Sequence, residues 1–131
     1  MFEVLKEASE EFAASVDAEL SECDNKNIRG YVSRVSIEGD ENYDIYLVLP
    51  KEKLDLVSEL FFGDRDYEVD DLSNEIANLI VGASKLKAEE KNTVYNISVP
   101  EFLGEYKGIK YDDLICFKLN GRDFYILLKE R

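Results

Sequence analysis

The stretch DDLSNEIANLIVGASK, residues 70–85, decides how this chain folds. Apolar residues recur in it at spacings of four and three, which is the repeat of one face of an α-helix. Asp70 or Asp71 supplies the N-cap or a first-turn carboxylate of this helix. The apolar line predicts a buried face made of Leu72, Ile76, Leu79, Ala83 and Leu86, with Ile80 beside them.

The same helix carries a polar stripe on another face. Asp71, Glu75, Asn78 and Gly82 follow one another at spacings of 4, 3 and 4, so they point to one side, and Val81 is also expected to face outward. Glycine inside a helix costs about 1 kcal/mol relative to alanine, so some gain should offset it. That gain is close approach of a backbone, either from this chain or from a partner. Glu75 and Asn78 are candidates for chemistry, although a solvated face gives the same pattern.

The rest of the chain alternates between helix and strand patterns. Helical spacing predicts a first helix over residues 2–20 and a short one over 51–63. Turns at residues 39–42 and at Asn120-Gly121 predict two antiparallel hairpins. The order predicts an α/β (α+β) sandwich in which helices pack on a largely antiparallel sheet, as one domain over residues 1–131, and its two similar halves suggest an internal repeat. Strands are expected at residues 28–39, 43–50, 93–100, 114–120 and 122–130.

Composition excludes several classes of function. With 29 acidic and 16 basic residues the net charge is −13, so nucleic acid and anionic membranes are poor partners and a basic protein surface is a good one. The chain has no histidine, which excludes Ser-His and Cys-His triads and the commonest zinc sites. Its first residues lack a signal-peptide pattern, so we expect a cytoplasmic protein with Cys23 and Cys116 reduced.

A calcium loop is the one metal site that the sequence allows. Asp64, Asp66, Glu68 and Glu75 fit positions 1, 3, 5 and 12 of such a loop. Val69, however, stands where the loop requires glycine for its sharp turn. We therefore predict no metal site.

The run EIANLIVGASK, residues 75–85, with Asp71 before it, resembles the D-x-x-x-E-x-x-N signature of the CheC/CheX/FliY chemotaxis phosphatases, and most closely its CheX form. SVPEFLG, residues 98–104, resembles a segment that follows in that family. There are departures, because Ala83 stands where CheX-like chains often have asparagine, and Ala14 stands where a second E-x-x-N of CheC-like members would have its amide. The resemblance implies a CheC-like sandwich with one active site.

The resemblance also implies an activity. The chain would be an enzyme that hydrolyses the aspartyl phosphate of a phosphorylated CheY-like response regulator, which carries its own Mg²⁺, so no cofactor of this chain is expected. Asn78 would orient the attacking water and Glu75 would engage a lysine of the regulator. The residues expected to bind the partner are Asp71, Asn74, Val81 and Gly82.

Other readings of the resemblance stay open. Relatives of this fold include non-catalytic modules that bind regulators or belong to the flagellar switch, and a stand-alone adaptor could sequester a phosphorylated regulator without hydrolysing it. CheX-like proteins can be homodimers whose sheets join across the interface. The C-terminal hairpin is one candidate edge for such pairing, although residues 122–130 could equally form a central strand.

Overall fold

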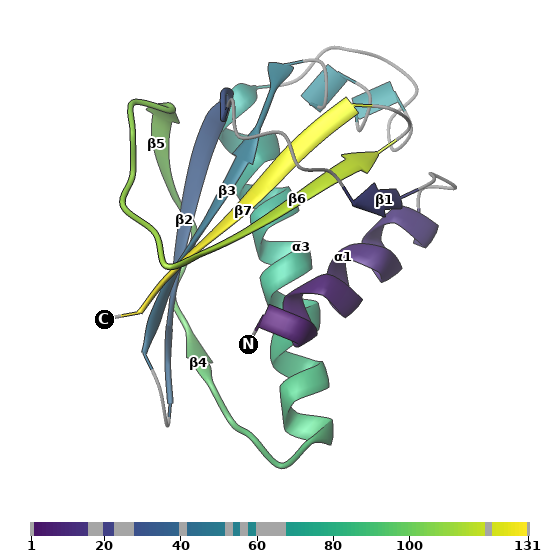
Figure 1. Ribbon diagram of the computed structural model, residues 1–131, viewed down its shortest axis with the longest axis vertical. Helices are drawn as coiled ribbons and strands as arrows, with labels where there is room; N and C mark the ends of the chain where they lie inside the picture. Colours follow the sequence, from purple (N-terminus) through teal and green to yellow (C-terminus); the bar gives the residue numbers. More distant parts are fainter. Residues whose placement is uncertain are drawn as a thin grey trace.

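The computed structural model describes residues 2–15, 20–22, 28–39, 42–51, 54–55, 58–59, 68–119 and 122–130. Two long helices, α1 and α3, lie on the same face of an antiparallel sheet whose strands differ in length (Figure 1). This arrangement confirms the predicted α+β class with helices packed on an antiparallel sheet. The elements are α1 (Phe2–Ser15), β1 (Leu20–Glu22), β2 (Tyr31–Glu38), β3 (Tyr43–Leu49), α3 (Val69–Glu90), β4 (Asn96–Ile97), β5 (Glu101–Glu105), β6 (Asp113–Leu119) and β7 (Arg122–Glu130).

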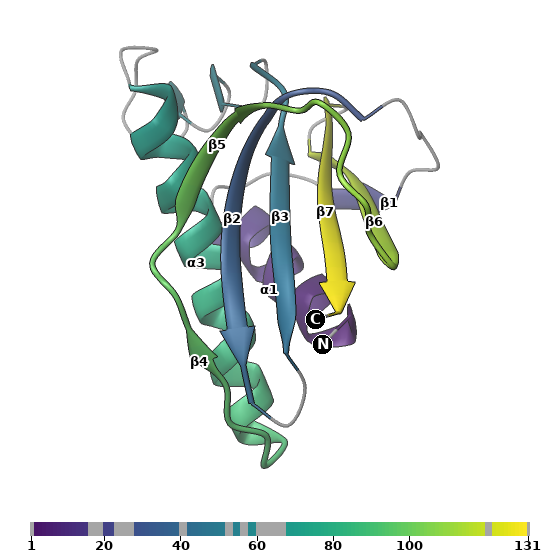
Figure 2. The ribbon, with the colours of Figure 1, turned by 90° about the vertical axis from the view of Figure 1, so that its left-hand side faces the viewer.

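The order of the strands in the sheet has the symmetry expected of the suggested internal repeat. The sheet runs β1-β6-β7-β3-β2-β4, and β5 also pairs with β2, beside α3 (Figure 2). The elements divide into two halves, α1-β1-β2-β3 and α3-β4/β5-β6-β7. If each strand is replaced by its counterpart in the other half, the sheet has the same strand order when it is read from the opposite edge. Each half thus lends its first strand or strands to an edge of the other half, and β3 pairs with β7 at the centre. The topology is that of two intertwined copies of one helix-and-strands unit. It also places residues 122–130 in a central strand, so the C-terminal hairpin is not an edge formed by β7.

Both hairpins form as predicted. β2 pairs with β3 from Ile37↔Tyr43 to Tyr31↔Leu49, and β6 pairs with β7 with Leu119 opposite Arg122. That register leaves two residues for the second connection, which is the length for which Asn-Gly is suited; the turn residues themselves lie outside the described part. Along the centre of the sheet, Ile45–Leu49 and Phe124–Leu128 are buried at every position, since both faces of these strands are covered.

The edges of the sheet differ from the prediction. The first helix ends at Ser15, and residues 20–22 form β1, which the polar sequence around it did not reveal. The predicted strand over 93–100 contributes only Asn96–Ile97, whereas residues 101–105 form β5. β5 is held by pairing with β2, by an ion pair of 2.6 Å between Arg34 and Glu101, and by stacking of Phe102 on Tyr31. These cross-strand contacts are not visible in a local pattern.

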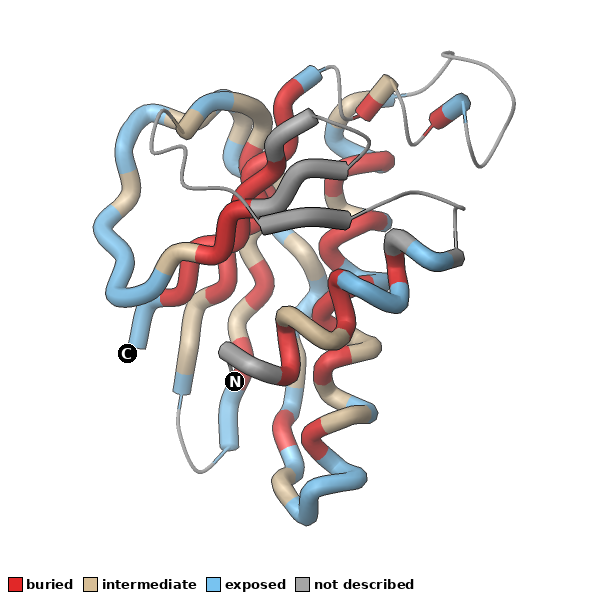
Figure 3. The backbone as a smooth tube through the Cα atoms, turned by 45° about the vertical axis from the view of Figure 1, so that its right-hand side comes forward, coloured by how far each residue is buried: buried red, intermediate tan, exposed pale blue. Residues whose placement is uncertain are grey.

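Two apolar clusters fill the two sides of the sheet. The larger lies under the helices and includes Leu5, Leu47, Ile76 and Ile80, and the buried residues of α1 and α3 face it (Figure 3). The smaller lies on the other face, around Val32, Tyr46, Val48, Cys116, Tyr125 and Leu127, and is covered in part by Tyr106 and Ile109. The predicted helix over 51–63 is helical at residues 51, 54–55 and 58–59, with Leu54 in the larger cluster; its other residues lie outside the described part.

One expectation about the cysteines is wrong. Cys116 is disulfide-bonded, whereas we expected reduced cysteines; Cys23 lies outside the described residues. Of the helices described here, none is both long and apolar enough to cross a membrane.

Candidate functional site

Helix α3 is rotated about its axis relative to the expectation. Of the predicted core line, Leu72, Ile76 and Ile80 are buried, but 47% of Leu79 and 63% of Leu86 are exposed. The helix is buried instead along a face rich in small residues, which allows it to lie close to β2. The buried residues of α3 are Leu72, Ser73, Ile76, Ala77, Ile80, Val81, Ser84 and Ala88.

The rotation changes the status of Val81. Its side chain is fully buried in the larger cluster, so the expectation that it faces outward is wrong. A side chain without exposed surface does not contact a partner that docks on the folded helix. Val81 is therefore a core residue and not a partner-binding residue.

The polar stripe does lie on the outside. Asp71, Glu75 and Asn78 are exposed and Gly82 is half-buried, so the helix presents these four positions to solvent as the spacing predicted. Asp71 is in the first turn of α3 and is not the N-cap, a position that Glu68 occupies. Neither Glu75 nor Asn78 has a side-chain hydrogen bond or ion pair to any residue in the described part of the chain. Within the described structure, both functional groups point to solvent.

Asn74 is tied to the sheet. The Ser33 hydroxyl on β2 donates a 2.8 Å hydrogen bond to Asn74 Oδ1, and Ser33 Oγ lies 2.6 Å from Ser73 Oγ. Ser33 and Ser73 are fully buried, while Asn74 is half-buried. The role of Asn74 in partner binding stays a prediction, but its contact with β2 shows a structural role.

The charges on α3 are divided between its two halves. Its first fourteen residues, 69–82, contain Asp70, Asp71 and Glu75 and no basic residue. Basic residues follow only at 85, 87 and 91, and each meets a carboxylate: Lys85 with Glu89, Lys87 with Glu11 and Lys91 with Glu7. The hydrogen bond that the Lys87 ammonium donates to Glu11 raises the pKa of Lys87. None of these three lysines is paired with a carboxylate of residues 69–82, here called the acidic half of the helix.

Gly82 lies in open space. A Cβ built on it would meet no atom within 4 Å among the described residues. Close packing by another segment of this chain, one of the two explanations for the glycine, is thus absent from the described structure. The approach of a partner at Gly82 stays a prediction.

The position on α1 that compares with the E-x-x-N motif is occupied differently. Glu11 is bound to Lys87 of α3 at 2.6 Å, and Ala14 is exposed. Within the repeat, the first helix therefore has a carboxylate engaged inside the chain and no amide. The site is built on α3 alone.

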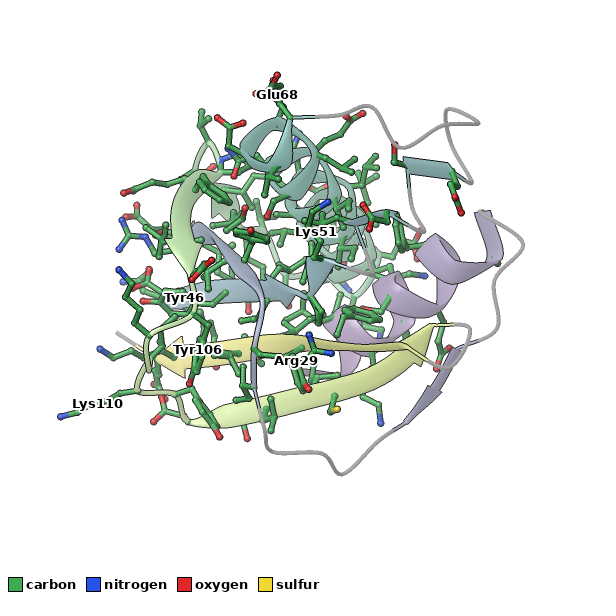
Figure 4. The ribbon with its side chains drawn as sticks, turned by 90° about the horizontal axis from the view of Figure 1, so that it is seen from above. Arg29, Tyr46, Lys51, Glu68, Tyr106 and Lys110 are labelled. Atoms are coloured by element: carbon green, nitrogen blue, oxygen red, sulfur yellow. The ribbon has the colours of Figure 1, made fainter. Side chains whose placement is uncertain are left out.

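The calcium loop does not form as a loop. Val69, at the position that requires a sharp turn, is the first residue of α3, and Glu68 extends from the start of the helix (Figure 4). Asp64 and Asp66 lie outside the described part. Among the described residues there is no group of three or more carboxylate or thiol side chains that could hold a metal ion.

A cavity of about 320 Å³ lies at the start of β2 and the end of β5. Its lining includes Arg29, Lys51 and Tyr106, whose side chains are seen in Figure 4. Lys51 is paired with Asp55 at 3.0 Å. The lining contains no member of the polar stripe, so a ligand there would not meet Glu75 or Asn78.

Comparison with known proteins reveals similarity of structure. No protein-family model matches the chain, and no curated protein matches it in sequence. The chemotaxis protein CheX of Vibrio vulnificus superposes with a TM-score of 0.79 at 16% identity, and the CheX of Desulfovibrio desulfuricans with a TM-score of 0.74 at 17% identity; each match covers 98% of this chain and 96% of the other. A chain in the CheX-CheY-BeF3-Mg²⁺ complex of Borrelia burgdorferi matches with a TM-score of 0.69 at 19% identity over 99% of this chain and 97% of its own.

These matches establish the fold of the chain, because they superpose well over nearly all of its length. At identities below 20% they show the fold and nothing further. The chain has the fold of CheX and CheC-like chemotaxis proteins, as the resemblance in residues 75–85 implied.

Proposed function

We propose that this chain is a phosphatase that removes the phosphoryl group from the aspartyl phosphate of a CheY-like response regulator. One observation carries the proposal: Glu75 and Asn78 lie one turn apart on the exposed side of α3 without a side-chain partner in the described structure. The shared fold supports it, since one of the similar structures is a complex of CheX with CheY. The long helix would be inserted at the regulator's phosphorylated aspartate.

Asn78 is proposed to place the water. Its amide oxygen accepts a hydrogen bond from a water molecule, which directs a lone pair of that water toward phosphorus. The water oxygen bonds to phosphorus as the bond from phosphorus to the aspartyl oxygen breaks, leaving inorganic phosphate and the free carboxylate. Phosphoryl transfer requires mainly positioning and charge stabilisation, so a fixed amide is sufficient where the regulator supplies Mg²⁺ and lysine.

Glu75 is proposed to hold the regulator's lysine. It is the exposed carboxylate nearest to Asn78 in the helix, and its half of α3 has no basic residue to compete for it. A lysine that approaches this half meets Asp71 and Glu75 together. The resulting ion pair would orient the regulator so that its acyl phosphate faces Asn78.

The test uses the full chain and a CheY-like receiver domain phosphorylated with acetyl phosphate and Mg²⁺. The wild-type chain should increase the rate of phosphate loss, and Asn78→Ala should lower that increase by about 10²-fold while the melting temperature is unchanged, because the side chain is exposed. Asn96→Ala, which changes an exposed asparagine on β4, is the matched control.

The outcomes separate the readings. Full activity of Asn78→Ala would show that the water is placed by another group. Binding of the receiver by the wild-type chain without turnover would identify a non-catalytic module or a sequestering adaptor, and the absence of both binding and turnover would refute the proposal.

We further propose that the chain forms homodimers. β7 is central, so sheets that join across an interface would use the β1 end or the β4 and β5 end of the sheet. Exposed Val94 and Val99 flank β4 at the second of these edges. Sedimentation velocity should detect the dimer, and Val99→Lys should dissociate it; a wild-type monomer at all concentrations would exclude it.

A further inference from the structure

Leu79 and Leu86, which were predicted to be core residues but are exposed, lie beside the proposed site residues Glu75 and Asn78 on α3. At about 100° per residue around the helix axis, Leu79 is about 40° from Glu75 on one side and Asn78 is about 60° from it on the other. Gly82 and Leu86 both fall within this arc. Glu75, Asn78, Leu79, Gly82 and Leu86, named here the α3 docking face, thus form one continuous surface about three turns long from Glu75 to Leu86.

Leu79 and Leu86 are exposed although other apolar residues of the same helix are buried. The larger cluster contains Leu72, Ile76 and Ile80 of the same helix, so apolar side chains of α3 do find places in the core. Leu79 and Leu86 nevertheless leave 47% and 63% of their surface exposed. Exposed apolar side chains next to charged groups are typical of a protein interface.

Gly82 lies between the two leucines in the helix. It is three residues after Leu79 and four before Leu86, and a Cβ there would meet no described atom within 4 Å. Because Gly82 has no side chain, the helix backbone is uncovered between the two exposed leucines, and we call this gap the notch. Such a gap can receive a backbone segment or a small side chain of another protein.

We propose that Leu79 and Leu86 are the apolar anchors that dock the response regulator, with its backbone seated over Gly82. The inference rests on the proposed function, because it assigns the partner that Glu75 and Asn78 serve. The chemistry of the docking face indicates which partner binds it. The Glu75 carboxylate at one end favours a basic group, and the leucines favour an apolar surface next to that group. A receiver domain presents a lysine beside its acyl phosphate, so this lysine would meet Glu75 and the neighbouring receiver surface would meet the leucines.

The test compares Leu79→Gln and Leu86→Gln, singly and together, with the control Tyr111→Gln, which changes a tyrosine that is 37% exposed and lies outside both the docking face and the proposed dimer edge. Steady-state dephosphorylation of the acetyl-phosphate-treated receiver gives KM and kcat, and titration of the receiver gives Kd. Each leucine variant should raise KM and Kd three- to tenfold with kcat within twofold of wild type. The control should change none of these, and all variants should melt at the wild-type temperature.

Each other outcome overturns the inference in a recognisable way. Unchanged KM and Kd in the double variant, while Asn78→Ala abolishes turnover, would refute the anchors and leave the proposed function standing. A wild-type chain that neither binds nor dephosphorylates the receiver would refute both. Loss of a dimer in sedimentation of the double variant, with unchanged affinity for the receiver, would show that a second copy of the chain covers this face.

Discussion

The Ser33 hydroxyl on β2 donates a 2.8 Å hydrogen bond to Oδ1 of Asn74 on α3, immediately before Glu75 in the sequence. Its one proton is used in that bond, so the proton of the 2.6 Å bond between Ser33 and Ser73 comes from Ser73. These two bonds, one buried and one partly buried, tie α3 to β2 in one rotation about the helix axis. The same rotation turns Glu75 and Asn78 toward solvent.

Removal of the Ser33 hydroxyl should therefore destabilise the protein. Ser33→Ala leaves polar atoms of Ser73 and Asn74 without their partner in a buried site, which costs about 1–3 kcal/mol in the free energy of unfolding. Urea denaturation measures this cost. Ser84→Ala is the control, since its buried hydroxyl bonds only the Val81 carbonyl of its own helix and its loss should cost less than about 0.5 kcal/mol. Equal stability of the two variants would show that the Ser33 bonds do not hold α3.

Truncation of two adjacent residues of α3 should lower the free energy of unfolding by very different amounts. Ile80 is fully buried, so Ile80→Ala should lower the free energy of unfolding by about 2–5 kcal/mol. Leu79 is half exposed, and Leu79→Ala should lower it by less than about 1 kcal/mol. Thermal or urea unfolding of the pair checks the rotation of the helix directly. If Leu79→Ala is the more damaging change, the helix faces the sheet as the sequence pattern predicted.

The rotation of α3 shows why the pattern of large apolar residues was an incomplete guide. Leu72, Ile76, Leu79, Ala83 and Leu86 fit the helical repeat, but so does a second line through Ser73, Ala77, Ile80 and Ser84. Small and polar residues count little in a hydrophobic pattern, yet they permit the helix to approach β2 closely. The Ser33 bonds that select this line join residues 40 positions apart, so no local signal contains them.

The central strands and the hairpins could be predicted because their signals are local. Alternating and continuous apolar runs specified β3 and β7, and Asn120-Gly121 specified the connection between β6 and β7. β1 and β5 are short edge strands defined by their partners, and neither contains an extended apolar run. Of the site, the exposure of Asn78 followed from spacing, which placed Glu75 toward the boundary of the core, whereas the exposure of the leucines beside them was not predicted.

Gly82 should be a position where stability and partner binding oppose each other. Gly82→Ala adds a methyl group in open space and improves helix propensity, so the free energy of unfolding should rise by about 1 kcal/mol and the melting temperature by roughly 3–5 °C. The same methyl group narrows the notch between Leu79 and Leu86, so Kd for the receiver should increase. Calorimetry and receiver titration measure the two effects on one sample. A gain in stability with unchanged affinity would leave the glycine without a role in docking.

Glu75 should act through charge, which separates its role from that of Asn78. Glu75→Gln keeps the shape of the side chain but removes its attraction for a lysine, so Kd for the receiver should increase by about tenfold, corresponding to about 1.4 kcal/mol. The difference from wild type should shrink as the ionic strength rises from roughly 0.01 M to 0.15 M, because salt screens the lost interaction. Glu89→Gln, which removes an exposed carboxylate already paired with Lys85, is the matched control and should leave Kd unchanged. A Glu75→Gln variant that binds like wild type at low salt would exclude an ion pair at this position and would leave Asn78 as the only polar contact of the docking face.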